Sequence, residues 1–444
     1  MDIRLWEAQL SDRSKQVRLE AASQLGKAIR EGSLSRTALE EVNNHVHTTY
    51  SFSPYEPSAA AYAAWKAGLG IVGSIDHDSI GAAEEMLLAS QQLGLASTVG
   101  FELRASFLDT PLSDRKINNP DSEGIAYLCI HGVPRQKLDE VAAFLKPLQE
   151  VRNKRNKAQV EALQALVGRY GFDLDFERDV LPLSRHEEGG SVTERHILYA
   201  MANQSIQMMG KGQKLVDFLE KDLGLSLPGT LATLLVDEQN PHYAYDLLGL
   251  FKSSFLPRFF IQPGREECLD VREVVAFSNR IGAIAAYAYL GDIAQSVTGD
   301  KKAEKFEDDF LEQLLDLLVD IGFPAITYMP PRNTEAQMKR LQALAKERGL
   351  MEISGVDINS SRQSMNCPQL LLPSARHLVD SAWALVAHEK LSSVNPALGL
   401  FSQGNPHAKA SLEKRIAYYA SLGRAMDATK PYSLIEQFEE KELS

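Results

Sequence analysis

The sequence predicts an α/β protein built around a parallel β-sheet. Short runs rich in apolar and β-branched residues, such as 69–75 and 96–101, alternate with stretches of helical pattern such as 79–93. This alternation is typical of parallel strands joined by crossover helices. Several apolar runs end on a histidine or a carboxylate, and functional side chains of α/β barrels lie at the C-terminal ends of strands. We therefore expect a barrel-like sheet with a functional site at one edge.

The chain divides into regions on the same reasoning. One long stretch has a helical character and carries loop signals at Gly189-Gly190 and Pro228-Gly229. We interpret it as an insertion that interrupts the barrel and forms a lid over the site. The expected regions are N-terminal helices over 1–40, a first barrel segment over 41–150, a helical insertion domain over 151–270, a second barrel segment over 271–385 and a C-terminal helical tail over 386–444.

Individual elements can be placed within these regions. The helix over 79–93 is expected to take Asp78 or Ser79 as its N-cap. In the second barrel segment we expect a helix over 304–321, a strand over 324–329 and a helix over 333–349.

Histidines and acidic residues at the strand ends form a candidate metal site. His45 and His47 are one residue apart on a predicted strand, so both imidazoles lie on the same face. Glu102 ends an apolar strand, where a carboxylate is costly to bury without a cation. His77 could instead orient a base or cap a helix, and His131 could be a core histidine.

The ordered set resembles the polymerase and histidinol phosphatase (PHP) superfamily. It consists of His45-x-His47, Asp76-His77, Gly100-x-Glu102, His131 and Gly355-x-Asp357, spread over roughly residues 41–150 and 271–365. The stretch 191–197, which contains Arg195-His196-Ile197, is similar to the Arg-x-His-Ile helix start in the insertion of stand-alone members of that superfamily. The resemblance implies a distorted (β/α)7 TIM-like barrel interrupted by a helical insertion, with the activity of a metal-dependent phosphoesterase.

The resemblance also implies a ligand set, which this chain matches incompletely. The first metal would take His45, His47, Glu102 and Asp357, and the second would share Glu102 and add His131. Where the family usually has a further histidine for the second metal, this chain has Tyr287 or Tyr289. His77 would serve a third metal, but its usual partners meet Ser51-Phe52-Ser53 and Asn359. We expect two divalent transition metals, manganese, zinc or iron, with His77, His131 and Asp357 as catalytic residues.

The implied reaction is hydrolysis of a small phosphomonoester, a nucleotide or a short phosphodiester by attack of metal-bound hydroxide. Arg104 would share the face of Glu102 on a continuing strand. Arg195 begins a helix with a capping-box pattern from Ser191 to Glu194, and such a helix start suits a phosphate. The predicted substrate-binding residues are Arg195, His196, Arg104, Arg115 and Asn359. The alternative is that the arginines form ordinary ion pairs and that His196 packs.

Two other functions remain open at this level. The chain could be a non-catalytic regulatory protein that binds metal or a phosphometabolite through a degraded PHP site. It could also be a metal-dependent hydrolase acting on a carbon–nitrogen or ester bond, because similar barrels host that chemistry.

The composition of the chain restricts the kinds of partner that we expect it to bind. The chain has 444 residues and a net charge of −12, which argues against sequence-independent binding to duplex nucleic acid. The three widely spaced cysteines, Cys129, Cys268 and Cys367, fit a reducing compartment. The N-terminus lacks an apolar signal core, and no window approaches the roughly 18 apolar residues of a membrane span. We expect a cytoplasmic protein with a small phosphorylated substrate and no membrane partner.

Overall fold

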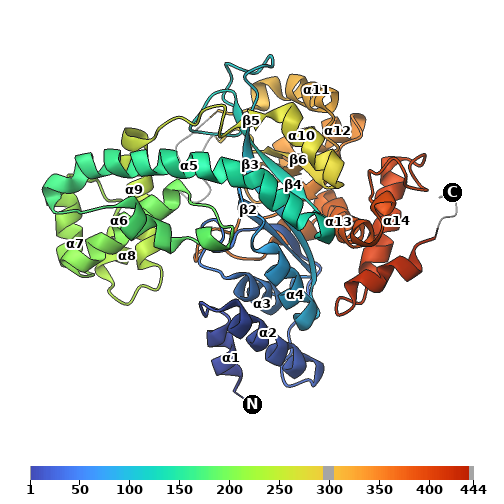
Figure 1. Cartoon of the computed structure of the whole chain (residues 1–444), viewed down its shortest axis with the longest axis horizontal. Helices are drawn as coiled ribbons and strands as arrows, with labels where there is room; N and C mark the ends of the chain where they lie inside the picture. The colour runs from blue at the N-terminus through green and yellow to red at the C-terminus, as the bar shows by residue number, and fades with distance from the viewer. Residues whose placement is uncertain (1, 294–304, 440–444) are drawn as a thin grey trace.

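A computed structural model of the chain describes residues 2–293 and 305–439. At its centre is one curled sheet with the strand order β1-β2-β3-β4-β6-β7-β8, and the short β5 pairs with β3 outside this path. Helices surround the sheet, as Figure 1 shows. The strands are β1 (Val42–Val46), β2 (Ile71–His77), β3 (Ala96–Ser106), β4 (Ile125–His131), β5 (Leu269–Asp270), β6 (Ile284–Tyr289), β7 (Ala325–Tyr328) and β8 (Met351–Ser354).

The α-helices fall before, between and after these strands. None of the helices in the described ranges is long and apolar enough to cross a membrane. The helices are α1 (Ile3–Gln9), α2 (Lys15–Arg30), α3 (Pro57–Lys66), α4 (Ala83–Leu93), α5 (Leu138–Val167), α6 (Glu194–Met209), α7 (Gln213–Asp217), α8 (Gly229–Val236), α9 (Tyr243–Phe259), α10 (Val271–Ile281), α11 (Leu311–Ile321), α12 (Glu335–Glu347), α13 (Arg376–Val394) and α14 (Leu412–Ala425).

The strands run parallel along this path except for β4. It pairs antiparallel with both β3 and β6, so the expectation of a wholly parallel sheet is wrong at this strand. The physical reason is the connection: residues 107–124 join β3 to β4 without a helix, whereas a parallel neighbour needs a crossover, usually through a helix.

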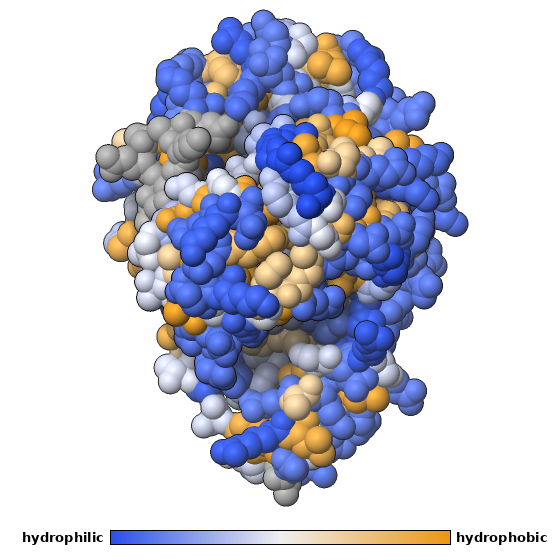
Figure 2. Space-filling model, turned by 90° about the vertical axis from the view of Figure 1, so that its left-hand side faces the viewer, coloured by the Kyte–Doolittle hydropathy of each residue, from blue (hydrophilic) through white to orange (hydrophobic). Residues whose placement is uncertain are grey.

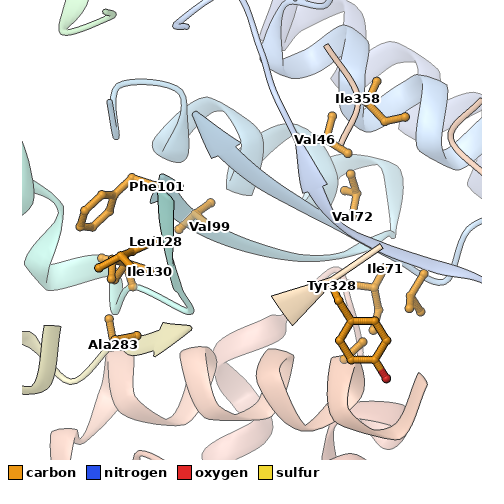
Figure 3. Packing of buried hydrophobic residues seen from close by; sticks show 14 of the residues in the cluster. Val46, Ile71, Val72, Val99, Phe101, Leu128, Ile130, Ala283, Tyr328 and Ile358 are labelled. Atoms are coloured by element: carbon orange, nitrogen blue, oxygen red, sulfur yellow. The ribbon is translucent and has the colours of Figure 1, made fainter. Parts of the chain in front are cut away.

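The first strand of the sheet path, β1, contacts the segment that follows the last strand, β8. An isolated parallel bridge joins Val46 to Ile358, just beyond β8. The His47 N–H donates to the Ile358 carbonyl at 3.0 Å, and the Ile358 N–H donates to the His45 carbonyl at 3.1 Å. Figure 3 shows the Val46 and Ile358 side chains side by side within the main hydrophobic cluster. This curled α/β sheet is consistent with a TIM-like barrel.

Alternate side chains of the strands point to opposite faces of the sheet, one towards the hydrophobic core and the other towards the candidate site. Phe101 and Leu103 on β3 belong to the main hydrophobic cluster together with Leu128 and Ile130 on β4. Burial of each such side chain contributes about 1.5–3 kcal/mol. The alternate residues of β3, including Glu102, therefore point to the opposite, concave face.

A helical unit, defined here as residues 151–267, lies beside the sheet and has its own hydrophobic cluster. The long helix α5 leads from the sheet into this unit (Figure 1). Phe52, from the loop after β1, also belongs to the cluster of the helical unit. Figure 2 shows apolar residues interleaved with polar ones on the face formed by this end of the molecule. The expected region boundaries at 150/151 and 385/386 fall inside α5 and α13.

Several local predictions need correction. The helix expected over 79–93 begins only at Ala83, and neither Asp78 nor Ser79 caps it. Ser79 Oγ instead donates to the Gly189 carbonyl at 2.7 Å, and Asp78 pairs with a distant arginine. Of the helix expected over 304–321, α11 forms the C-terminal portion, and Glu304 lies outside the described residues.

Candidate metal centre

The end of β1 presents two imidazoles on one face of the strand. The His45 and His47 rings lie with their centroids 5.1 Å apart. Asn43 holds this strand end, because its Oδ1 accepts from the N–H groups of His45 and Val356, both at 2.9 Å. Gly355 permits the close approach: a Cβ built there would lie 2.5 Å from His45 Cβ. Asn43, before the histidine pair, and Gly355, before Asp357, thus hold β1 against the segment beyond β8.

Carboxylates from β3 and from the loop after β8 meet these imidazoles. His45, His47 and Glu102 offer ligand atoms that all lie within 4.8 Å of one another. Glu102 Oε2 is 3.7 Å from His45 Nε2 and 3.8 Å from His47 Nε2. Asp357 Oδ1 lies 3.1 Å from His47 Nε2, and His77 Nδ1, at the end of β2, lies 3.1 Å from Glu102 Oε2. The structure therefore brings together five of the predicted ligands: His45, His47, His77, Glu102 and Asp357.

The residues present fit a divalent metal ion. The Nε2 atoms of His45 and His47 are buried and have no hydrogen-bond partner within residues 2–293 and 305–439. Leaving such a group unpaired costs about 1–3 kcal/mol, which coordination to a metal would remove. Imidazole and carboxylate together suit zinc, manganese and iron.

The protonation states of Glu102 and His77 match those of ligands, whereas that of His45 does not: burial lowers the His45 pKa, but the neighbouring Cys129 and Glu102 outweigh burial and raise it well above its usual value. Burial alone would raise the pKa of Glu102, but the neighbouring His77, His45 and His47 outweigh it and lower the pKa to about 2. Burial lowers the pKa of His77 to about 3, so its imidazole is neutral at pH 7. A deprotonated carboxylate and a neutral imidazole are the forms that bind metal.

Hydrogen bonds behind the ligands orient them. Ser51 Oγ lies 3.2 Å from His47 Nδ1 and donates to Asp76 Oδ1 at 2.7 Å. Thr48 donates to the same Asp76 carboxylate through its N–H and its hydroxyl, both at 2.7 Å. Partners of this kind fix the tautomer and ring orientation of a ligating histidine. Sequence reasoning treated the stretch Ser51-Phe52-Ser53 only as the place of a missing ligand, and it missed this supporting role of Ser51.

Cys129 is a second residue that sequence reasoning missed. Its Sγ lies 3.9 Å from both His45 Nδ1 and Glu102 Oε1. Since β1 and β4 are separated by β2 and β3, about 14 Å of flat sheet, such a contact requires the curl that turns these side chains inward. Burial raises the pKa of the Cys129 thiol to about 11, so it is protonated. The available signal was the i, i+2 spacing of Cys129 and His131 on one face.

His131 does not lie at the same level as the other predicted ligands. Because β4 is antiparallel, its chain runs away from the level of Glu102 towards His131, which pairs with Ile284 at the start of β6. The residue of β4 that is level with Glu102 is Cys129, which comes two residues before His131 and lies roughly 7 Å from it along the strand. The His131 Nε2 is nevertheless buried, with no hydrogen-bond partner in the described ranges of the chain. His131 is the last residue of β4, as expected, and its role as a ligand stays a prediction.

The tyrosines at predicted ligand positions lie in polar contacts of their own. The Tyr287 hydroxyl donates to Glu307 at 3.2 Å, and the Tyr289 hydroxyl donates to Asp308. Burial raises the pKa of Glu307 to about 8. These contacts give Tyr287 and Tyr289 partners other than the cluster around Glu102.

The predicted phosphate-binding residues separate into two groups. Arg195 Nη1 donates to Asn359 Oδ1 at 2.5 Å, and Asn359 Nδ2 donates to Asp357 Oδ1 at 2.6 Å, so these two residues adjoin the cluster. Arg104 is buried and pairs with Glu267. Arg115 is exposed and lies over the Phe310 ring, with the guanidinium 5.5 Å from the ring centroid.

His196 serves the start of α6 rather than the cluster. Its Nδ1 accepts from the Thr193 N–H at 2.9 Å, and its ring packs against Phe52 with centroids 5.0 Å apart. The capping box of α6 is formed by Thr193 and His196, not by Ser191 and Glu194 as the sequence pattern predicted. Ser191 Oγ instead donates to the His77 carbonyl.

A buried ion-pair network connects β2 to the helical unit. Arg152 on α5 pairs with Asp78 and, at 3.1 Å, with Glu194. Arg155 pairs with Glu194 at 2.7 Å and with Glu267 at 2.6 Å. Asp78 directly follows His77 and has φ of +49°, the one positive φ among the non-glycine residues of the described ranges. Backbone strain of this kind clusters at functional sites.

No protein-family model matches the chain, and no curated protein matches it at a significant level. A solved structure from Bifidobacterium adolescentis, provisionally described as a metal-dependent phosphoesterase, is similar with a TM-score of 0.48 and 17% identity over 77% of this chain and 96% of that one. An amidohydrolase from Chromobacterium violaceum, with bound sulfate and no metal, is similar with a TM-score of 0.48 and 16% identity over 74% of this chain and 90% of that one.

Proposed function

We propose that the chain is a metal-dependent hydrolase of phosphoesters, of the PHP type. The observation that supports this most strongly is the convergence of His45, His47, Glu102 and Asp357, in which the buried Nε2 atoms of His45 and His47 have no hydrogen-bond partner within the described residues. A purely structural cluster would satisfy those nitrogens with hydrogen bonds.

The proposed roles follow from the geometry of the cluster. His45, His47, Glu102 and Asp357 would hold one metal, and Glu102 with His77 would contribute to a second, weaker site. Bound there, a divalent metal supplies Lewis-acid polarisation of the ester and acidifies water. The Asp76 carboxylate, acting through Ser51, would keep the His47 ring oriented.

A small anionic substrate is the proposed ligand. Arg195 supports this choice, because it is only half-buried and reaches the cluster through Asn359. Arg104 supports it less, since its guanidinium already pairs with Glu267. Arg195 is therefore the proposed contact for the phosphoryl group.

The test is release of phosphate from phosphomonoesters and nucleotides, and of the monoester product from short diesters, with added Mn²⁺. We expect metal-dependent turnover that EDTA abolishes and that falls at least a hundredfold in His47→Ala. The matched control is His377→Ala, since His377 is a half-exposed histidine on α13, paired with Glu352 at 3.3 Å. An unchanged rate in His47→Ala would refute the proposed site.

A second candidate function is metal or phosphometabolite binding without turnover. It is favoured by the tyrosine and asparagine side chains at positions where the PHP resemblance expects ligands, because these are bonded to Glu307, Asp308 and Asp357. Calorimetric binding of Mn²⁺ and of inorganic phosphate, with silence across the whole ester panel, would favour this regulatory function over the enzyme.

A further inference from the structure

The metal ligand Asp357 is linked to the helical unit through a short relay of side chains. Asp357 Oδ1 accepts from Asn359 Nδ2 at 2.6 Å, and Asn359 Oδ1 accepts from Arg195 Nη1 at 2.5 Å. The arginine therefore fixes which way the amide points, and directs its NH₂ group at the carboxylate. In this orientation Asn359 supports Asp357 instead of offering its own oxygen to a metal.

The same loop is attached to the helical unit at a second place. Arg362 donates to Asp246 on α9 through Nε at 2.7 Å and through Nη2 at 2.8 Å. Ser361 Oγ lies 2.7 Å from His242 Nδ1, in the turn before α9. We name these contacts, Arg362–Asp246 and Ser361–His242, the loop clasp.

The clasp has the geometry of a specific attachment. The Arg362–Asp246 pair is bidentate, the arrangement that adds directional strength to an arginine–carboxylate contact. The Asp246 side chain is 8% exposed, and the buried Asn240 donates to it at 2.7 Å. The carboxylate is therefore held in place before it meets Arg362.

We propose that the helical unit tunes the affinity of the metal site by positioning Asp357 through the relay and the loop clasp. Arg195, Asn359, Ser361 and Arg362 are positioning residues here. This rests on the proposed metal site, and it extends that proposal by coupling the site to residues more than a hundred positions away in the sequence. Supporting groups around ligating carboxylates change metal affinity about 10–100-fold when they are removed.

The sign of the change in metal affinity distinguishes positioning from simple electrostatics. Removal of Arg362 takes a positive charge away from the vicinity of a cation site, and simple Coulomb attraction then predicts tighter metal binding. Loss of positioning predicts the opposite. Arg362→Met therefore separates the two explanations by the sign of the change.

The experiment is calorimetric titration of the full-length protein with Mn²⁺ alone, without any substrate. We expect Arg362→Met to weaken Mn²⁺ binding about fivefold or more. The matched control is Arg265→Met, because Arg265 also pairs with an aspartate through two nitrogens, at 2.8 and 3.1 Å, but on the loop after β3. The control is expected to bind as the wild type does. Binding by Arg362→Met that is unchanged or tighter would overturn the proposal.

A double-mutant cycle and a milder variant complete the test. If the pair acts as a unit, Asp246→Leu combined with Arg362→Met costs no more affinity than Arg362→Met alone. Additive losses would count against the clasp. Ser361→Ala removes one hydroxyl and replaces Arg362→Met if that variant does not fold. A wild-type protein that binds no Mn²⁺ would overturn the metal site itself, whereas variants that match a binding wild type would overturn only the positioning.

Discussion

Substitution of Asp78 separates electrostatics from backbone strain beside the candidate metal centre. The Asp78 side chain is 9% exposed and pairs with Arg152, whose side chain is 4% exposed. Asp78 also has φ of +49°, a conformation that asparagine and glycine adopt readily and alanine does not. Asn, Ala and Gly at this position therefore change the charge and the strain in different combinations.

The magnitude follows from burial and from the remaining partner. Removal of one member of a buried ion pair costs about 3–5 kcal/mol. Glu194 still lies 3.1 Å from Arg152, and Asn keeps an acceptor, so we expect Asp78→Asn to lower the free energy of unfolding by about 2–3 kcal/mol. Asp78→Ala should lose a further 1–2 kcal/mol, roughly, from the left-handed backbone. Asp78→Gly should not carry that additional strain.

The assay is urea unfolding followed by circular dichroism, with identical conditions for all variants. Asp173→Asn is the control, because Asp173 is an exposed partner of Arg178 with a side chain that is 83% exposed. It should not change the unfolding midpoint measurably. The reasoning is refuted if Asp78→Asn unfolds with the wild-type midpoint, or if Asp78→Ala is as stable as Asp78→Asn.

The remaining predictions concern the candidate metal centre and the loss of folding stability at acid pH. Gly355→Ala should lower Mn²⁺ affinity and stability, the latter by about 1–3 kcal/mol, because the new Cβ would meet His45 Cβ at 2.5 Å. Ser51→Ala should weaken Mn²⁺ binding about 10–100-fold by freeing the His47 ring. Burial lowers the pKa of His388 to about 4, so the unfolded chain binds a proton below about pH 6.5 that the folded chain does not. Its contribution of about 3 kcal/mol is present above pH 6.5 and lost as the pH falls towards 4, and urea unfolding of His388→Asn should show a shallower loss over that range.

Controls for these variants come from the same chain. Gly229→Ala places a Cβ where nothing lies within 4 Å, and it should leave both metal affinity and stability unchanged. Ser51→Thr keeps the hydroxyl and should restore most of the binding that Ser51→Ala loses. A wild-type Mn²⁺ affinity in Gly355→Ala would contradict the close packing described here. An unaltered pH slope in His388→Asn would contradict the burial effect on that histidine.

Local patterns in the sequence predicted the faces of strands but not their levels. The i, i+2 spacing of His45 and His47 is enough to place both imidazoles together, because alternation is a local property of a strand. The height of His131 depends instead on the direction of β4, and an apolar run reads the same in either direction. Only the connection over 107–124, which has no helical pattern, carried that information.

Contacts between residues far apart in the sequence also determine which arginines are available to bind a phosphate. The sequence correctly placed Arg104 on the face of Glu102, two residues further along β3. Its partner Glu267 is 163 positions away along the chain, and no local pattern joins the two. Arg195 was predicted at a helix start and does lie there, but its contact with Asn359 arises only when the helical unit meets the loop after β8.

The departures from the ligand pattern that the PHP resemblance implies are organised rather than random. Ser51 and Asn359 stand where further ligands were expected, and each is hydrogen-bonded to a residue of the first site: Ser51 to His47, and Asn359 to Asp357. A ligand position that is converted into a support strengthens the neighbouring ligand, since an oriented imidazole or carboxylate loses less freedom on binding. Loss of metal binding altogether would place no such demand on these side chains. Under the proposed function, these supports would favour one tight metal site formed by His45, His47, Glu102 and Asp357, with His77 and Glu102 contributing to a weaker second one.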